Sequence, residues 1–226
     1  MDSFAFNGSL ASQLPRDIPR VGPMAMPMSM PGPSGQGYNR YREMTLEELL
    51  LEKRILFLVG EINHVSASRL IMQMLYLQSI QGKEDINLYI NCPGGVVDDT
   101  LAIYDTMKYL PCAVATYCIG RAESGGAIIF MAGTKSKRFI LPNAKVMIHQ
   151  PFGGVWGQAA DIEIQAEEIL KTKDTLIQIM AKCTGQKFER IREDSERDRF
   201  FDAAGAVKYG ICDEVIGEEV TENKEK

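Results

Sequence analysis

The fold is decided by the stretch "INLYINCPGGVVDDTLAIYDTMKYLPCAVATYCIGRAESGGAIIFMAG", residues 86–133. Two short apolar runs, 86–90 and 113–119, each end in a glycine-containing turn and lead into a helical pattern. Short apolar strands that alternate with helices predict βαβ units, which build a mostly parallel sheet flanked by helices. In such sheets functional groups collect in the loops that leave the carboxyl ends of the strands. Three segments are singled out in this way: 91–95, 120–125 and the residues after His149.

The same alternation extends to both sides of this stretch, so the predicted fold class is α/β with repeated βαβ units. A helix opens at Thr45, where Glu48 three residues later completes a capping-box signature. We further predict strands at 54–60, 137–141 and 144–149 and helices at 66–81, 98–109, 124–133 and 158–183. The last helix is longer than a small domain needs. Its pattern alone leaves open whether it covers the core or projects toward a partner.

Composition bounds the class of protein. The 226 residues carry 45% hydrophobic and 24% charged side chains, which is ordinary for a soluble globular chain. The net charge of −5 gives no support to nucleic-acid binding. No segment approaches the ~18 uninterrupted apolar residues of a membrane span. We therefore expect neither a nucleic-acid nor a membrane partner.

The five cysteines form no CxxC pair and have no histidine at a metal-ligand spacing. We interpret them as small buried hydrophobic residues in a reducing compartment and expect no metal site. The N-terminus has no basic region followed by an apolar core, so secretion is not indicated. The expected location is cytoplasmic, with an organelle matrix or stroma as the alternative.

The ends of the chain differ from its middle. Residues 1–42 are rich in methionine, proline and glycine without any helical or strand period, which predicts a disordered or cleavable extension. Residues 43–217 are the predicted folded domain, and 218–226 are a charged C-terminal tail.

Ser124 is the candidate nucleophile, but taken alone it is better explained as a helix N-cap, because serine is among the preferred N-cap residues. Of the two histidines, His149 closes an apolar strand and is the candidate base, whereas His64 is interpreted as a surface or cap residue. Gly95, in the turn after the second strand, can present a backbone N–H to an oxyanion, as can Gly125. No spacing argument chooses the acid among Asp194, Asp198 and Asp202.

The motifs together resemble one family. The segments "NCPGG", "GRAESGGA", "KRFILPNAKVMIHQPFGGVWGQAADIEIQAEEIL" and "TGQKFERIREDSERDRFFDAAGAVKYGICDEVI" are similar to the proteolytic subunit of the Clp protease, the ClpP family. The likeness runs from about residue 46 to residue 216, with 25 residues from Ser124 to His149 and 49 from His149 to Asp198.

The resemblance implies a serine endopeptidase that forms an acyl-enzyme and needs no cofactor. Ser124 matches the family's nucleophile, His149 its base and Asp198 its orienting acid. The backbone N–H groups of Gly95 and Gly125 match its oxyanion hole.

The resemblance also implies an assembly. In the family the long helix is a handle that interlocks two stacked rings of seven subunits, and the rings can be homomeric or mixed. The enclosed chamber cleaves unfolded polypeptides that an ATP-driven AAA+ unfoldase of the Clp type feeds into it. Four residues match the family's docking pocket for that unfoldase: Tyr89, Tyr109, Phe139 and Leu141.

The chain departs from the family pattern beside the nucleophile. Glu123 stands where a small residue is usual, and Gly125 where methionine is usual; Asn87 replaces a common aromatic near the docking pocket. If Glu123 faced the site, its charge would stabilise protonated His149 and oppose general-base action. The alternative function is therefore a catalytically weak ring subunit that assembles with an active paralogue. A crotonase-like acyl-thioester enzyme, the third hypothesis, is disfavoured by the ordered serine, histidine and aspartate.

Overall fold

A computed structural model of the chain describes residues 25–28, 40–154 and 156–217. The chain divides into two units, Met1–Lys53 with Glu219–Lys226, and Arg54–Glu218, which are described separately. In the first unit β1 (Ala25–Met28) pairs antiparallel with β2 (Arg40–Glu43), and α1 spans Leu46–Glu52. Strand β1 lies inside the predicted extension 1–42 and β2 crosses its end by one residue; neither strand was expected. The remainder of that extension and the tail 218–226 lie outside the described residues, so the domain boundaries stay predictions.

Helix α1 begins with the predicted capping box. The Thr45 N–H donates to Oε2 of Glu48 at 2.8 Å, and the Glu48 N–H donates to Oγ1 of Thr45 at 3.2 Å. These bonds satisfy donors that the first turn of a helix leaves without partners.

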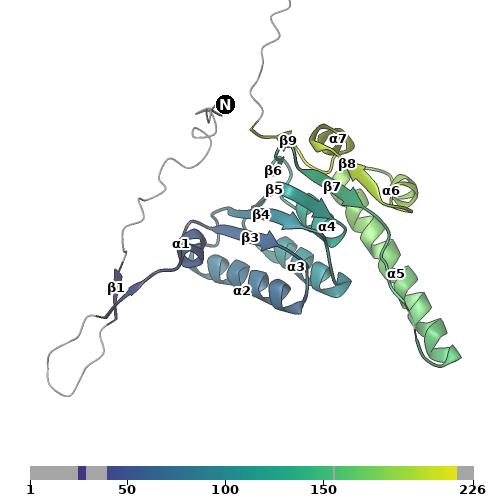
Figure 1. Cartoon of the computed structure of the whole chain (residues 1–226), viewed down its shortest axis with the longest axis horizontal. Helices are drawn as coiled ribbons and strands as arrows, with labels where there is room; N and C mark the ends of the chain where they lie inside the picture. The colour runs from purple at the N-terminus through teal and green to yellow at the C-terminus, as the bar shows by residue number, and fades with distance from the viewer. Residues whose placement is uncertain (1–24, 29–39, 155, 218–226) are drawn as a thin grey trace, which may run out of the picture. The chain divides into compact units, whose positions relative to one another are not determined.

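The second unit is built on a seven-stranded sheet (Figure 1). Its strands are β3 (Ile55–Val59), β4 (Ile86–Cys92), β5 (Val114–Glu123), β6 (Arg138–Ile140), β7 (Lys145–Ile148), β8 (Arg199–Phe201) and β9 (Glu214–Val215). The main path runs β3-β4-β5-β6-β9, all parallel. The predicted parallel α/β sheet is confirmed.

One edge of β5 pairs with β4, and the other edge pairs with two strands in succession. Its first half pairs with β6 through residues 116–118, and its last three residues pair with β7 through residues 121–123. Strand β8 then pairs antiparallel with the outer side of β7. As a result, β5 and β7 end side by side, and the start of β8 lies next to the end of β7.

Helices connect and cover the strands: α2 (His64–Ile80), α3 (Val97–Tyr109), α4 (Gly125–Met131), α5 (Ala159–Thr184), α6 (Phe188–Asp194) and α7 (Ala203–Tyr209). The predicted starts and ends of the first four differ by no more than two residues from those observed. Helices α6 and α7 were not predicted. Every residue of α4 is buried, so this short helix forms the centre of the core.

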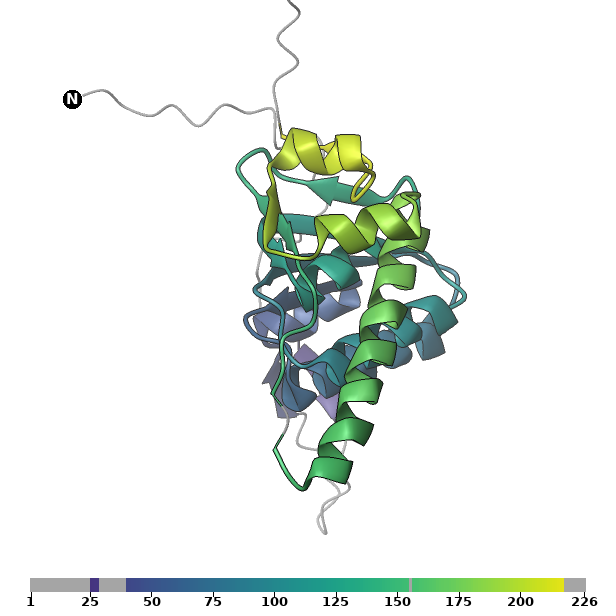
Figure 2. The ribbon, with the colours of Figure 1, turned by 90° about the vertical axis from the view of Figure 1, so that its right-hand side faces the viewer.

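Helix α5 both covers the core and projects from it. Its residues 159–171 are exposed, whereas Leu176, Ile177 and Met180 near the other end are buried. In Figures 1 and 2 its N-terminal end extends beyond the rest of the unit. The C-terminal half of α5 therefore covers the core, and its N-terminal half projects, so each of the two interpretations of the sequence pattern holds for one half of the helix.

The five cysteines are free and buried, as the composition indicated. Burial raises the pKa of the Cys118 thiol to about 11, so this group stays protonated at neutral pH. Within the described part of the chain, no helix is long and apolar enough to cross a membrane.

One buried cation that the sequence did not single out joins four segments. Arg138 is 3% exposed, and its Nε and Nη2 donate to the two carboxylate oxygens of Asp213 at 3.0 and 2.6 Å. Its Nη1 donates to the carbonyls of Met131, Cys183 and Gly210. Arg138 thus ties β6 to the ends of α4 and α5 and to the segment after α7.

Candidate active site

Ser124 lies in the turn between β5 and α4, in a conformation that non-glycine residues rarely adopt. Its φ is 53° and its ψ is −121°. Its N–H donates to the Met147 carbonyl on β7 at 2.9 Å, which holds the turn against the neighbouring strand. Its side chain makes no capping bond to α4. Ser124 thus occupies the N-cap position, but its hydroxyl does not cap the helix, and its backbone is held in a strained conformation.

Glycine is required at two positions where the loop after β4 and the Ser124 turn approach each other closely. A Cβ on Gly94, whose φ is +99°, would lie 2.7 Å from the Ser124 Cβ and 3.1 Å from the Gly125 nitrogen. A Cβ on Gly126 would lie 2.8 Å from the Cys92 carbonyl oxygen. The distances of 2.7 and 2.8 Å are shorter than real Cβ contacts, so only glycine lets the loop after β4 pack on the Ser124 turn.

His149 follows β7 directly and faces the serine. Its Nε2 lies 2.8 Å from the Ser124 Oγ. Its Nδ1 lies 3.1 Å from Oδ1 of Asp198. Because a carboxylate can only accept, Nδ1 carries a proton there, and in the neutral ring Nε2 is left as the acceptor for the serine hydroxyl.

Of the three candidate aspartates, one lies beside His149. Asp194 binds Arg190, Arg199 and Tyr209. Asp202 caps α7 by accepting from the Gly205 N–H at 2.7 Å. Asp198, in the loop before β8, is the one of the three that reaches His149, and its side chain is 61% exposed.

Asp194 instead anchors the C-terminal segment. Burial raises its pKa, but the hydrogen bonds from Arg190 and Tyr209 and the nearby charge of Arg199 outweigh it and lower the pKa overall. The carboxylate is thus held ionised by structural partners, which leaves it without a role at the histidine.

The two predicted oxyanion donors lie on adjoining turns. Among the described residues, neither the Gly95 N–H nor the Gly125 N–H donates a hydrogen bond to another protein group. Gly95 packs so closely on Ile62 that a Cβ would lie 2.0 Å from the Ile62 carbonyl oxygen. This backbone-to-backbone contact fixes the direction of the loop that carries the Gly95 donor.

Glu123 is turned toward two cations. Its Oε2 lies 3.4 Å from Nη1 of Arg121, and its Oε1 lies 3.6 Å from Nζ of Lys145. Its side chain is 11% exposed. Both carboxylate oxygens are therefore paired with cations, and the described contacts of His149 are with Ser124 and Asp198 and not with Glu123.

Gly125 is matched to a buried threonine. A Cβ on Gly125 would lie 2.5 Å from Oγ1 of Thr100, which is 1% exposed and donates to the Val96 carbonyl. We expect Gly125→Ala to lower, about 100-fold, the peptidase activity that the sequence predicts, because the added methyl displaces the Ser124 turn, a shift of the order of 1 Å. Peptide hydrolysis by Gly125→Ala and by the Gly125→Ala, Thr100→Ala double variant checks this. Removing the hydroxyl should restore most of the rate, and an unrestored double variant would contradict the proposed clash.

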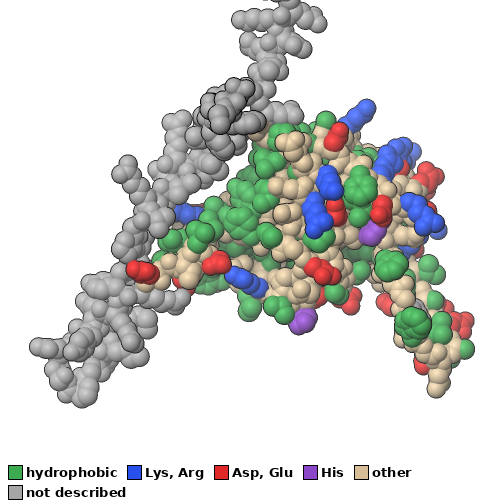
Figure 3. Space-filling view, in the orientation of Figure 1, with side chains coloured by type: hydrophobic (Ala, Val, Ile, Leu, Met, Phe, Trp, Pro, Cys, Tyr) green, Lys and Arg blue, Asp and Glu red, His purple; other side chains and the backbone are tan. Residues whose placement is uncertain are grey.

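Two of the four predicted docking residues lie in one aromatic ladder. Phe57, Tyr89, Tyr117 and Phe139 stack across β3, β4, β5 and β6 with ring centroids 5.4, 4.6 and 5.0 Å apart. Tyr117 also donates to Oδ1 of Asn87 at 3.2 Å, so the polar replacement supports the ladder. In Figure 3 hydrophobic side chains gather over these strands.

The sequence missed Phe57 and Tyr117 because only the strand register aligns them with the other two rings. Tyr109, 74% exposed at the end of α3, and Leu141, just after β6, make no described aromatic contact with the ladder.

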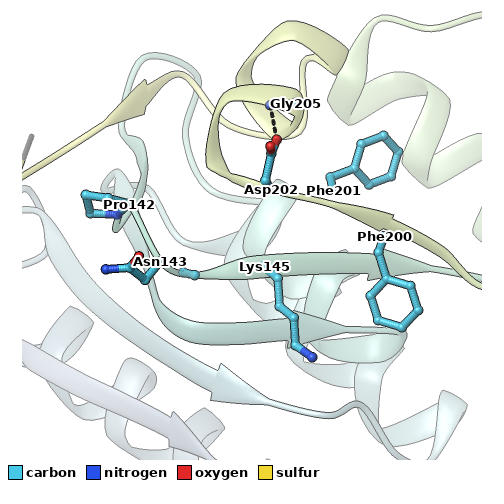
Figure 4. A pocket seen from close by; sticks show the side chains of 8 residues that line it. Pro142, Asn143, Lys145, Phe200, Phe201, Asp202 and Gly205 are labelled. Carbon is cyan, nitrogen blue, oxygen red and sulfur yellow. Dashed lines mark hydrogen bonds between the residues drawn. The ribbon is translucent and has the colours of Figure 1, made fainter.

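Figure 4 shows an open hollow of about 500 Å³ whose lining does not include Ser124, His149 or Asp198. It is lined by residues of the β6–β7 turn and of the segment from β8 into α7, including Lys145 and Phe200. Within the described residues, no three histidine, cysteine, aspartate or glutamate side chains gather closely enough to hold a metal ion.

Two comparisons with known proteins agree. A family model described as Clp protease matches residues 38–219. The chain is 52% identical over 183 residues to "ATP-dependent Clp protease proteolytic subunit 1" of Rhodopirellula baltica, an alignment that covers 81% of each chain.

Proposed function

The chain belongs to the Clp protease family and is a serine-type endopeptidase subunit, and we propose that Ser124, His149 and Asp198 are its catalytic triad. The observation that carries these roles is the continuous chain of contacts from the serine hydroxyl through both ring nitrogens to the carboxylate, at 2.8 and 3.1 Å. Distances of this size are within hydrogen-bond reach, which a nucleophile and its base require.

In the proposed reaction, Ser124 Oγ attacks the peptide carbonyl carbon while His149 Nε2 takes its proton. The tetrahedral intermediate collapses, and the C–N bond breaks as the imidazolium returns that proton to the leaving amine. Water then attacks the acyl-enzyme with His149 again as base, and the peptide acid leaves Ser124. Asp198 keeps the ring oriented and stabilises the imidazolium in both halves.

The N–H groups of Gly95 and Gly125 are the proposed oxyanion donors. Two observations support this role. Among the described residues neither N–H group donates to another protein acceptor, and the loop that carries Gly95 packs closely on the Ser124 turn. Donors held before the reaction stabilise the developing negative charge without reorganisation.

A fluorophosphonate probe tests the nucleophile directly. We expect it to label the assembled protein at Ser124, located by peptide mass mapping, and to abolish peptide hydrolysis in proportion to labelling. Hydrolysis that persists in fully labelled protein would refute the assignment. The catalytically weak ring subunit predicts assembly without labelling, and with Glu123 paired to Arg121 and Lys145 no observation favours it.

Asp198→Asn should lower kcat for a short peptide by 100-fold to about 10⁴-fold because an amide can stabilise the wrong imidazole tautomer. KM should change little because Asp198 acts on the histidine rather than on the substrate. Asp202→Asn is the matched control, since its carboxylate caps α7 and has no contact with His149. Equal losses in the two variants would show a structural effect instead.

The family assembles as an oligomer with Clp ATPases, and we propose two stacked seven-membered rings for this chain, homomeric or mixed. The projecting half of α5 supports a subunit contact there, since Ile162, Ile164 and Leu170 are exposed on it. Phe152 and Trp156, in the segment before it, are 96% and 89% exposed. Apolar exposure of this extent is typical of an interface. Unfolded polypeptides are the proposed substrates and the cytoplasm the proposed location.

The aromatic ladder, with Tyr109 and Leu141 as further candidates, is the proposed docking site for an AAA+ unfoldase. The 46% exposure of Phe57 at the ladder's edge supports an apolar contact. Tyr89→Ala should lower unfoldase-dependent protein degradation at least tenfold and leave hydrolysis of a short peptide within twofold, because only the former needs docking. Tyr76→Ala, on exposed α2 surface, is the control. A parallel loss of both activities in Tyr89→Ala would contradict a docking role.

A further inference from the structure

The three proposed catalytic residues sit at the ends of three different strands. Ser124 follows β5, His149 follows β7 and Asp198 precedes β8. The ladders that join these strands are short, with three residue pairs between β5 and β7 and three between β7 and β8. Backbone pairing over so few residues leaves side-chain contacts to fix how the strand ends sit relative to one another.

One face of these strands carries a chain of side-chain contacts that crosses all three. Glu123 on β5 is paired with Met147, which is in turn paired with Phe200 on β8, so these residues share a face with Lys145 on β7. Lys145 Nζ lies 3.6 Å from Oε1 of Glu123 and 5.5 Å from the centroid of the Phe200 ring. Both distances are within the range of an ion pair and of a cation–π contact.

The burial of these groups is unequal. The Glu123 side chain is 11% exposed, whereas those of Arg121 and Lys145 are 47% and 55% exposed. A nearly buried carboxylate is costly unless cations compensate it. Both cations do so, but Arg121 belongs to the same strand as Glu123, and Lys145 belongs to the neighbouring one. Lys145 is therefore the partner that can hold one strand to another.

We propose that Glu123, Lys145 and Phe200 form a brace that positions the nucleophile, base and acid relative to one another. The described contacts of these three side chains do not include Ser124, His149 or Asp198, so the brace acts through the strands and its members are positioning residues. It also accounts for the glutamate beside the nucleophile. Lys145 and Phe200 border the open hollow, as Figure 4 shows, so the brace lies on the molecular surface and is bounded on one side by solvent.

The proposal rests on the proposed triad and is tested on the assembled protein with a short peptide substrate. Lys145→Met should lower kcat about tenfold and leave KM within twofold, because displaced catalytic groups slow the reaction without altering ground-state binding. The rate of fluorophosphonate labelling should fall by the same factor. Lys145→Arg, which keeps the charge and the ring contact, should retain at least half of kcat.

Arg121→Met is the matched control, because it removes a cation of similar exposure from the same carboxylate without cutting a link between strands. Its kcat should stay within twofold of the unsubstituted protein. The kcat of Glu123→Gln should equal that of Lys145→Met. The kcat of the double variant should be no lower than that of either single variant, since both substitutions remove the same ion pair.

Unchanged kcat in Lys145→Met, an equal loss in Arg121→Met, or an additive hundredfold loss in the double variant would overturn the brace. So would a loss that disappears when rates are expressed per assembled particle, measured by light scattering. Each of these rates is compared with the rate of the unsubstituted protein, which must itself be active. A parent that neither cleaves peptide nor labels at Ser124 would instead refute the proposed function.

Discussion

Ser124→Ala is expected to lower peptide hydrolysis by about 10⁴-fold or more while leaving the assembled particle intact. Removing a triad nucleophile eliminates the covalent route, and the remaining rate comes from substrate binding and oxyanion donors alone. The loss should appear almost wholly in kcat. The measurement is steady-state hydrolysis of a fluorogenic peptide, with the particle size followed by light scattering in the same sample.

The hydroxyl itself is not needed for the fold, since it makes no capping bond to α4. Ser79→Ala is a suitable control because the Ser79 hydroxyl donates within α2, to the Tyr76 carbonyl, far along the chain from the site. Its activity should be unchanged. Dissociation of the particle in Ser124→Ala would show that the residue has a structural role that the geometry does not predict.

Arg138→Met is expected to lower the free energy of unfolding by about 3–5 kcal/mol, the range for breaking a buried ion pair by removing one partner. The substitution leaves Asp213 without its cation and removes the donor shared by three carbonyls. Denaturant unfolding under conditions where the oligomer is dissociated measures this loss. Lys137→Met is the neighbouring control, because its ion pair with Asp85 is about 40% exposed on both sides and such pairs contribute about 0–1 kcal/mol.

The ion pair of Arg138 with Asp213 also predicts that the free energy of unfolding falls at acidic pH. Burial raises the pKa of Asp213, but the hydrogen bonds and charge of Arg138 outweigh it and lower the pKa below the ordinary value of an aspartate. A carboxyl group with a lowered folded-state pKa stabilises the protein above its unfolded pKa, and this stabilisation is lost as the pH falls through the folded value. The stability of the unsubstituted protein should therefore fall more steeply below about pH 4 than that of Arg138→Met.

Pattern and spacing in the sequence led to most of the fold and to the identity of the candidate base. The alternation of apolar runs and helical periods is local, so it predicted β3 to β7 and α1 to α5. Helices α6 and α7, β8 and β9 are short, and their patterns are interrupted by charged residues, so no period identified them. The ends of α5 were found, but which half is buried depends on what α4 and the sheet cover.

At the site, the sequence alone left three alternatives open that distances then resolved. Ser124 could be a cap, any of three aspartates could be the acid, and Glu123 could face the histidine. None of these is a local property, because each depends on which strands are neighbours. The split pairing of β5 with β6 and then β7 brings residues 25 positions apart into contact, and β8 adds one that is 49 positions further along.

The sequence by itself determined the class of fold, the order of the helices and strands from α1 to α5, the glycine turns and the set of residues able to perform acyl transfer. These follow from periodicity and from the chemistry of single side chains, both of which are carried by neighbouring residues. Only the tertiary structure decided which hydroxyl, ring and carboxylate meet, and toward which cations Glu123 turns. Strand register decides them, since hydrogen bonds between distant segments place each side chain on one face and beside one neighbour.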